Sequence, residues 1–457
     1  MDNLQKFYID GAWVSPDSTN TMPVINPATE QIVATVALGN AADVDRAVAA
    51  ANQAFKTFSM TSKQERLALL ERIKTVTEAR FEDLAQAMRE EMGAPITFAR
   101  EAQADAAIGH LQGFADALEQ LEEEIDLGNG ELLVREPIGV CGLITPWNWP
   151  INQIALKVLP ALAAGCTCVL KPSEHTPLSA IIYAEILHDA GCPPGVFNLV
   201  NGEGPEVGTA MSKHPDIQMM SFTGSTRAGT AVTHDSAESV KRVTLELGGK
   251  SANLVFADSD LEERVQNAVA ECMANTGQSC DAPTRLLVER SCYDEVVEIA
   301  KASGMEYARI VDETRNFSLP NDFLRWKPST HQFGKAYYEA KNLENDQKEL
   351  ALFNNLTTDF LRSDTLALYT VWGHSWEMGD SDAKWNDLET CFKQIANSKA
   401  VCALTMIEVV DYLQAYKLLQ VSETKHSVFN PSTITVFVSV DGKTYKIRPK
   451  SSLKLPK

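Results

Sequence analysis

The segment VCGLITPWNWP, residues 140–150, combines a short apolar run with proline, polar and aromatic residues directly after it. Four further apolar runs follow, namely TCVLKP (167–172), VFNLVNG (196–202), MMSFTG (219–224) and SANLVFA (251–257). Helical stretches such as LSAIIYAEILHDAG (178–191) separate them. This alternation is typical of buried parallel strands that are joined by crossover helices. The sequence therefore predicts an α/β fold with a doubly wound sheet.

The region before residue 140 is mainly helical in pattern. Apolar residues recur at helical spacing in 41–55 and 62–93, and Asn40 before the first stretch is a residue type that caps helix N-termini. The segment GELLVREPIGV, residues 130–140, alternates between apolar and polar residues. We interpret it as a two-sided strand that leads into the sheet.

Length, charge and cysteine usage limit the class of protein. The chain has 457 residues, 44% of them apolar, and a net charge of −20, which predicts a multidomain globular protein and argues against nucleic acid or an anionic membrane as main partner. The sequence shows no secretory signal and no apolar run of about 18 residues, so we expect a cytoplasmic location. The nine cysteines form no CxxC pair. The following four are expected to be reduced thiols in the core: Cys141, Cys166, Cys168 and Cys272.

The acidic excess lies entirely in residues 1–303, because residues 304–457 contain 19 basic and 19 acidic residues. Such a change in composition predicts a domain boundary. In the second part, 365–378 has the pattern of a buried strand, and 385–397 and 407–420 have helical patterns. Residues 432–449 predict a hairpin with its turn at Asp441-Gly442.

Cys280, in NTGQSCDAPTR (275–285), is a candidate nucleophile. A thiolate that attacks a carbonyl needs an oxyanion donor and a base that hydrolyses the resulting thioester. Asn148 offers an amide N–H beside the Cys280 backbone N–H, and Glu246 in LELGGK (245–250) offers a carboxylate. Taken singly, each has a simpler interpretation, because a lone cysteine is usually a small core residue and a glutamate beside two glycines is usually solvated.

Two further motifs suit a nucleotide. In KPSEHTP (171–177), Lys171 and Glu174 follow a predicted strand and suit ribose hydroxyls; the carboxylate would repel a 2′-phosphate, which favours NAD over NADP. In FTGSTRAG (222–229), small residues let backbone N–H groups and the Ser225 hydroxyl approach a pyrophosphate at a helix N-terminus.

Together with VINPATEQIVATV (24–36) and TPWNWP (145–150), these motifs make residues 1 to about 302 resemble the aldehyde dehydrogenase superfamily. The resemblance implies a Rossmann-like NAD-binding domain over 1–246, with an oligomerisation hairpin near 128–140, and a partial catalytic domain over 247–302. It implies that Cys280 is the nucleophile, Glu246 the general base and Asn148 the oxyanion donor. The NAD contacts that it implies are Thr145, Pro146, Trp147, Lys171, Ser173, Glu174, Gly204, Gly208, Phe222, Gly224, Ser225 and Leu247.

The chemistry that the resemblance implies is oxidation of a small aldehyde. A Cys280 thiohemiacetal transfers hydride to NAD, and the resulting thioester is hydrolysed to a carboxylate. Family members have a Glu-containing EIFGPV-type segment, a Phe-Gly-Gly segment and a final oligomerisation strand later in the chain, and none of these appears here. We therefore expect weak or no dehydrogenase activity, and a homo-oligomer is an open expectation.

Residues 303–457 are instead similar to the C-terminal part of NodB-like polysaccharide deacetylases, through GMEYARIV (304–311), FSLPNDFLRWKPSTHQF (317–333) and YTVWGHSWEM (369–378). The similarity implies a partial α/β, deacetylase-barrel-like segment in which His374 lies at a strand end beside the active site; a purely structural histidine is the alternative. The family's TFDDG-type aspartate and HxxxH pair are absent, so we predict no metal site. Two rival functions are a carbohydrate deacetylase, against which these absences argue, and a chimera of two incomplete enzymes without activity.

Overall fold

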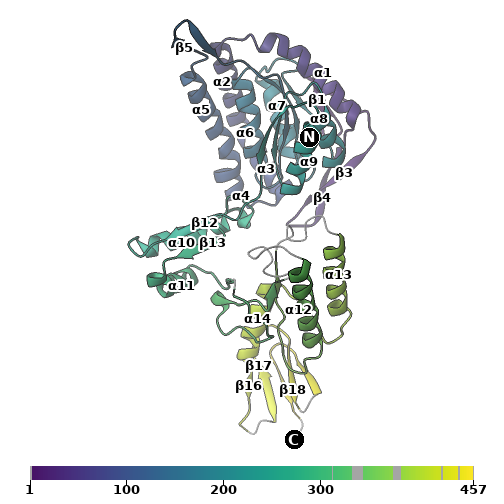
Figure 1. Cartoon of the computed structure of the whole chain (residues 1–457), viewed down its shortest axis with the longest axis vertical. Coiled ribbons are helices and arrows are strands. Elements are labelled where there is room, and N and C mark those ends of the chain that lie inside the picture. Colours follow the sequence, from purple (N-terminus) through teal and green to yellow (C-terminus); the bar gives the residue numbers. More distant parts are fainter. Residues whose placement is uncertain are drawn as a thin grey trace. The chain divides into compact units, whose positions relative to one another are not determined.

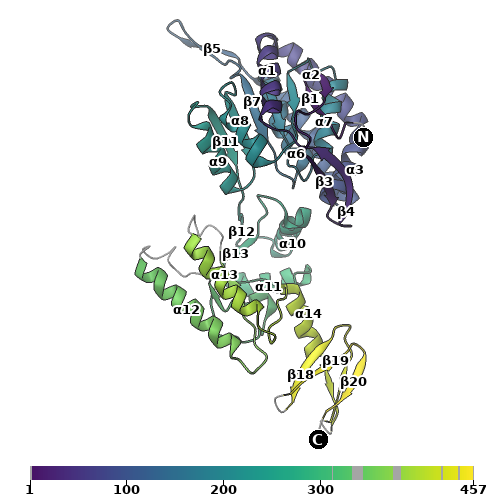
Figure 2. The same ribbon diagram turned by 90° about the vertical axis from the view of Figure 1, so that its right-hand side faces the viewer.

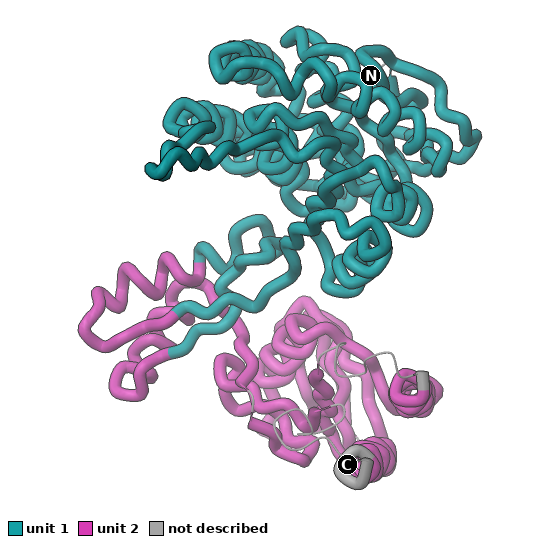
Figure 3. Tube along the Cα trace, turned by 45° about the horizontal axis from the view of Figure 1, so that its top comes forward, with its two compact units in different colours: residues 1–253, 270–287 teal, residues 254–269, 288–457 magenta. Residues whose placement is uncertain are grey.

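The computed structural model of the chain (Figure 1) describes residues 3–310, 312–331, 343–373, 382–423, 426–440 and 443–455. The chain divides into two compact units, which Figure 3 distinguishes by colour. Unit 1 comprises Met1–Asn253 and Ala270–Leu287, and unit 2 comprises Leu254–Val269 and Val288–Lys457. The domain boundaries at 246 and 302 stay predictions.

A seven-stranded sheet forms the centre of unit 1, in the order β11-β10-β7-β8-β9-β1-β2. Its five parallel strands are β7 (Val140–Ile144), β8 (Thr167–Lys171), β9 (Phe197–Leu199), β10 (Met219–Thr223) and β11 (Arg242–Glu246). At the other edge, β1 (Phe7–Ile9) pairs antiparallel with both β9 and β2 (Ala12–Val14). Every residue of β7, β8 and β9 is buried, which confirms the predicted doubly wound α/β sheet.

Helices cover both faces of this sheet (Figure 1). One core joins the sheet to α2 (Lys63–Ala79), α3 (Phe81–Met92), α5 (Asp105–Gln120), α6 (Pro150–Ala163) and α7 (Leu178–Asp189). A second core joins the opposite face to α1 (Ala41–Phe58), α8 (Thr209–Lys213) and α9 (Thr226–Ser236). The short α4 (Ile96–Phe98) and a π-helical turn, η1 (Ala99–Ala104), lead into α5. Cys141, Cys166 and Cys168 are buried in the first core as expected, whereas Cys272 is only half-buried.

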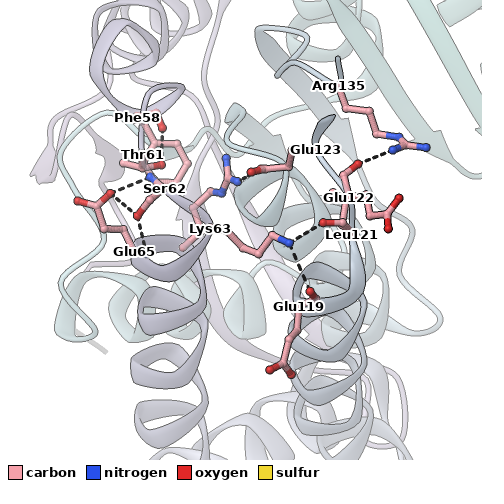
Figure 4. A network of polar contacts seen from close by, with 11 residues as sticks. Phe58, Thr61, Ser62, Lys63, Glu65, Glu119, Leu121, Glu122, Glu123 and Arg135 are labelled. Carbon is pink, nitrogen blue, oxygen red and sulfur yellow. Dashed lines mark hydrogen bonds and ion pairs between the residues drawn. The ribbon is translucent and has the colours of Figure 1, made fainter. Parts of the chain in front are cut away.

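Capping residues fix where the first two long helices begin. The Asn40 side chain accepts hydrogen bonds from the backbone N–H groups of Ala42 and Asp43, which confirms Asn40 as the N-cap of α1. Ser62 and Glu65 form the equivalent box at the start of α2 (Figure 4). Lys63 beside them donates to the last carbonyls of α5, which ties the two helices together at this end.

Two hairpins stand apart from the sheet, β3 (Thr21–Asn26) with β4 (Gln31–Ala37), and β5 (Glu124–Gly128) with β6 (Glu131–Val134). The second projects from the body of unit 1 (Figure 2), and every residue of β6 is exposed. The prediction that residues 130–140 form one strand leading into the sheet is therefore wrong. Gly128, Asn129 and Gly130 have positive φ angles of 80°, 59° and 81°, which form a tight turn and fold β6 back onto β5.

The expectation that SANLVFA adds a buried strand to the main sheet is also wrong. Among the described strands, β12 (Ala252–Val255) pairs only with β13 (Arg285–Val288), and Val255 is its single buried residue. A short apolar run does not distinguish a strand that is buried on both faces from one that is buried on one face. The helices α10 (Leu261–Met273) and α11 (Tyr293–Ala302) accompany this pair along the chain.

Unit 2 contains small sheets and helices after α11. Its described strands are β14 (Thr330–His331) parallel to β15 (Val371–Trp372), β16 (Gln420–Val421) with β17 (Ser427–Asn430) and β20 (Ser451–Lys454), and β18 (Val436–Val440) with β19 (Lys443–Ile447). The helices α12 (Leu343–Leu361) and α13 (Asp382–Ala396) pack through Phe353, Leu388 and Cys391, and α14 (Met406–Lys417) is capped by Thr405. In the ranges that the structure describes, no helix is long and apolar enough to cross a membrane.

The predictions for this second part have mixed outcomes. The two helices and the hairpin near 432–449 are confirmed. Of the buried strand expected at 365–378, the described residues form only the two-residue, half-buried β15. His374 and the Asp441-Gly442 turn lie outside the described residues. The deacetylase-like architecture stays a prediction.

Candidate active site

The switch point of the sheet lies between β7 and β10, which are neighbours whose connections run to opposite sides. In open α/β sheets, ligands bind at the carboxyl ends of the strands at this point. Thr145 follows β7 and Thr223 ends β10, and both hydroxyls are buried without a hydrogen-bond partner in the described part of the chain. The side-chain amide of Asn201, just after β9, is also buried without a hydrogen-bond partner in the described part of the chain. Because buried polar groups normally have partners, these three groups indicate a ligand at this edge.

An ion pair lies at the end of β8. Lys171 is almost fully buried, and its Nζ donates to Glu174 at 3.2 Å and to the Pro172 carbonyl at 2.8 Å. Burial lowers the pKa of Lys171, although Glu174 opposes this effect. Burial raises the pKa of Glu174, but the Lys171 ammonium and hydrogen bonds lower it more, so that it lies below the usual value. The pair therefore presents a carboxylate next to the strand end, with Ser173 buried beside it.

The N-terminus of α9 follows β10 directly. Ser225 caps this 11-residue helix by accepting from the Ala228 N–H at 3.3 Å. A side chain at Gly224 would place its Cβ 2.6 Å from the Phe222 ring, so any larger residue would force this ring to move. At Gly204, which begins the π-helical turn η2 (Gly204–Gly208), the space around a Cβ is open. Small residues at these turns and a helix N-terminus suit a pyrophosphate, so the residues present fit a dinucleotide.

The other predicted cofactor contacts differ in exposure. Phe222 is buried, Pro146 and Leu247 are half-buried, and Trp147 is exposed. In the turn η2, Gly208 lies next to the Lys171 side chain: a Cβ on this glycine would be 4.0 Å from two of the Lys171 side-chain carbons.

The loop before Cys280 has an unusual backbone. Asn275, Thr276 and Gly277 have φ angles of 52°, 55° and 74°, so three residues in succession adopt the left-handed conformation. Two of them are not glycine, and such residues persist only where the surroundings hold them. Buried Asn275 is held by its side chain, which donates to the Asn148 carbonyl at 2.8 Å.

Side chains from residues 148 and 149 reach this loop. Asn148 Nδ2 donates to the Gln278 carbonyl at 2.6 Å, and Trp149 Nε1 donates to Ser279 Oγ at 2.8 Å. The structure thus brings together the predicted oxyanion donor and the segment that carries the predicted nucleophile. Cys280 itself is exposed.

The LELGGK segment also meets the Cys280 loop. A Cβ on Gly249 would lie 2.7 Å from the Cys280 carbonyl oxygen, so glycine allows this close approach. Glu246 ends β11, is exposed, and accepts from the Gly224 N–H through its backbone at 3.0 Å. Within the described ranges, no hydrogen bond joins the Glu246 carboxylate to Cys280 or Asn148. Its role as general base therefore stays a prediction.

Lys157 is a residue of this region that the sequence interpretation missed. It lies buried in α6, and its Nζ is 2.9 Å from Ser221 Oγ. Burial lowers the pKa of Lys157 to about 8, although the Glu246 charge acts in the opposite direction. The signal in the sequence was a single charged residue in the otherwise apolar stretch IALKVLPALA.

Side chains that could bind a metal ion are the last feature of the site. Among the residues that the structure describes, no group of three or more His, Cys, Asp or Glu side chains is arranged to hold a metal ion. In unit 2, the His331 ring packs edge-on against Trp372, with ring centroids 4.5 Å apart.

Comparison with known proteins agrees with this geometry. The Aldehyde dehydrogenase family matches residues 13–314. The chain is 51% identical over 334 residues to 3-succinoylsemialdehyde-pyridine dehydrogenase from Pseudomonas sp, which covers 68% of this chain and 70% of the relative. It is 47% identical over 294 residues to a putative aldehyde dehydrogenase from Staphylococcus aureus, covering 64% of this chain and 62% of that protein.

Solved structures give the same result. An aldehyde dehydrogenase from Bartonella henselae matches with a TM-score of 0.65 and 48% identity, over 68% of this chain and 65% of that one. A second match is a cysteine-to-alanine mutant of aldehyde dehydrogenase C from Pseudomonas syringae, in complex with NAD+ and octanal. The TM-score is 0.65 and the identity 53%, and the match covers 66% of this chain and 62% of that one. The chain thus spans between 62% and 70% of the length of these four relatives. The chain belongs to the aldehyde dehydrogenase family.

Proposed function

We propose that this chain oxidises an aldehyde to a carboxylate with NAD, through a covalent intermediate on Cys280. The observation that supports this most is the hydrogen bond from Asn148 Nδ2 to the Gln278 carbonyl. It holds an amide donor beside the loop that carries the sulfur, as oxyanion stabilisation requires.

Each residue has one task in this reaction. The Cys280 thiolate attacks the aldehyde carbon, and the developing oxyanion accepts hydrogen bonds from the Asn148 amide and the Cys280 N–H. NAD, when bound, supplies the hydride acceptor. Glu246 then takes a proton from the water that attacks the thioester, and the Cys280 thiol is released with the carboxylate.

The cofactor preference follows from Glu174. Its carboxylate is paired with Lys171 at the end of β8, where a ribose would lie, and its negative charge would repel a 2′-phosphate. We therefore propose NAD rather than NADP. Among the related structures, that of aldehyde dehydrogenase from Bacillus cereus is also an NAD+ complex.

We further infer that turnover is slow. The family match ends at residue 314, and Cys280 is exposed rather than enclosed. A nucleophile of this kind depends on walls that exclude water and hold the carbonyl in attack geometry.

The test uses purified protein, NAD and a panel of aliphatic and aromatic aldehydes, with NADH absorbance as the readout. We expect Cys280→Ala to abolish NADH formation, and Asn148→Ala to lower kcat roughly 100- to 1,000-fold, because one oxyanion donor is lost. Cys402→Ala is the matched control, since Cys402 is an exposed cysteine of unit 2.

Three results would contradict the proposal. Turnover that persists in Cys280→Ala would exclude the covalent intermediate. Complete absence of NADH formation with every aldehyde would favour a chimera without activity, and acetate release from acetylated glycans with added Zn²⁺ would favour a deacetylase.

A further inference from the structure

A buried amide lies behind the Asn148 backbone. Gln103 belongs to the π-helical turn η1 (Ala99–Ala104), and its side chain has no exposed surface. Its Nε2 donates to the Asn148 carbonyl at 3.1 Å and lies 3.4 Å from Met92 Sδ. π-Helical turns occur frequently at functional sites, where the extra residue in the turn redirects side chains.

The Asn148 carbonyl accepts two side-chain hydrogen bonds from distant parts of the sequence. One comes from Gln103 and the other from Asn275 Nδ2 at 2.8 Å. A carbonyl oxygen has two lone pairs, so its capacity to accept is fully used. The Asn148 side chain in turn donates to Gln278, whose carbonyl also lies 3.4 Å from Asn275 Nδ2. The four amides therefore form one connected network.

We propose that Gln103 is a positioning residue for Asn148, and this inference rests on the proposed function. In the described part of the chain, the Gln103 side chain bonds to Met92 and Asn148 and not to Cys280. It fixes the Asn148 peptide plane, and the fixed plane determines where the Asn148 amide points. Loss of this donor would let the peptide plane rotate, and small displacements of a group that stabilises a transition state cost much of the rate.

Packing alone does not explain a glutamine at this place. Gln103 Oε1 is buried without a hydrogen-bond partner among the described residues, and such an oxygen destabilises the folded state. A methionine of similar volume would fill the same space and remove this cost. Stability and activity should therefore change independently, or in opposite directions, when Gln103 is replaced.

The first experiment compares Gln103→Met with the control Gln112→Met in the full chain. Gln112 is an exposed glutamine of α5 that bonds to Asp116. We expect Gln103→Met to lower kcat about 10- to 100-fold, with the Kd for NAD unchanged and the melting temperature equal or higher. An unchanged kcat, or a fall in kcat together with the melting temperature, would overturn the proposal.

A second variant, Gln103→Glu, separates positioning from structure through its pH profile. A protonated carboxyl can donate to the Asn148 carbonyl, whereas a carboxylate cannot. We expect kcat of Gln103→Glu, divided by kcat of the wild type, to fall as pH rises through the pKa of the new carboxyl group, which burial raises. A ratio that stays constant with pH would contradict a role through the donated hydrogen bond.

Hydrogen exchange, which needs no turnover, tests the positioning role of Gln103 separately from the proposed aldehyde oxidation. If the wild type oxidises no aldehyde, the proposed function fails, but hydrogen exchange still tests the positioning network. We then expect faster exchange of the amides in 275–280 in Gln103→Met than in Gln112→Met. Equal exchange in these variants would overturn the positioning role by itself.

Discussion

Glu91, near the end of α3, is a carboxyl group that the fold buries almost completely. Its two oxygens accept hydrogen bonds from the backbone N–H groups of Leu178 at 2.5 Å and Ser179 at 3.1 Å, where α7 begins. Burial nevertheless dominates and raises its pKa to about 7, from the 4.5 of an ordinary glutamate. The folded state therefore favours the protonated form.

This shift determines how stability depends on pH. The contribution of protonated Glu91 to the stability of the folded state is fully present below the unfolded-state pKa of 4.5. It is lost as pH rises through the folded-state pKa of about 7. We expect Glu91 to lower the free energy of unfolding by up to roughly 3 kcal/mol between about pH 5 and pH 8. Denaturant unfolding of Glu91→Gln should show a weaker pH dependence than the wild type, and the control Glu90→Gln should not. Parallel pH curves for Glu91→Gln and the wild type would be evidence against this shift.

At the residue scale, sequence motifs identified candidates that the structure partly brings together. Lys171 pairs with Glu174, and Asn148 bonds to the loop that carries Cys280; the roles of these four residues stay predictions. Gln103 was not recognisable, because its partner lies 45 positions away and its direction depends on a π-helical turn. No local pattern encodes that geometry.

At the scale of elements, helix caps give a direct test of local stability. Ser62 Oγ accepts from the Glu65 N–H at 3.3 Å, and Glu65 accepts from the Ser62 N–H at 2.7 Å (Figure 4). Removal of this cap leaves a donor at the helix start without its partner. We expect Ser62→Ala to lower the free energy of unfolding of unit 1 by about 1 kcal/mol, as measured by denaturant titration.

Ser62→Thr is the matched control for this cap, because threonine keeps the hydroxyl and should retain most of the stability. An equal loss in both variants would mean that the packing of Ser62, and not the hydrogen bond, stabilises α2.

Elements with a strong local pattern were predictable, and their partners were not. The apolar runs of β7, β8 and β9 indicate strands that are buried on both faces, and this pattern can be recognised without knowledge of the neighbouring strands. β6 and β12 have comparable local patterns, but one forms an exposed hairpin and the other a separate two-stranded sheet. Strand pairing depends on turns and on distant segments, which periodicity does not specify.

At the scale of the whole molecule, each unit has buried clusters of its own, two in unit 1 and one between the described parts of α12 and α13 in unit 2. Calorimetry of the full chain should therefore show at least two unfolding transitions. NAD at about 100 times its Kd should stabilise only unit 1, by about 2.7 kcal/mol, because a ligand stabilises the structure that binds it.

Pulsed hydrogen exchange identifies which transition belongs to which unit. Lys171→Met is the control. Because it removes the cation that pairs with Glu174, we expect NAD to shift the unfolding transition of unit 1 less in this variant. A single transition that NAD shifts as a whole would contradict independent units.

The antiparallel edge of the sheet has a consequence for the order of events during synthesis. Tyr8 in β1 is paired with Leu199 in β9, and all three residues of β1 are buried. The hairpin partner β2 follows β1 at once, but the ribosome must add close to two hundred residues before β1 can pair with β9 and join the sheet. At synthesis rates of about 5–20 residues per second this takes roughly 10–40 s. During that interval Phe7 and Ile9 remain in water on a nascent chain, so this apolar tripeptide is a natural contact point for a chaperone at the ribosome exit.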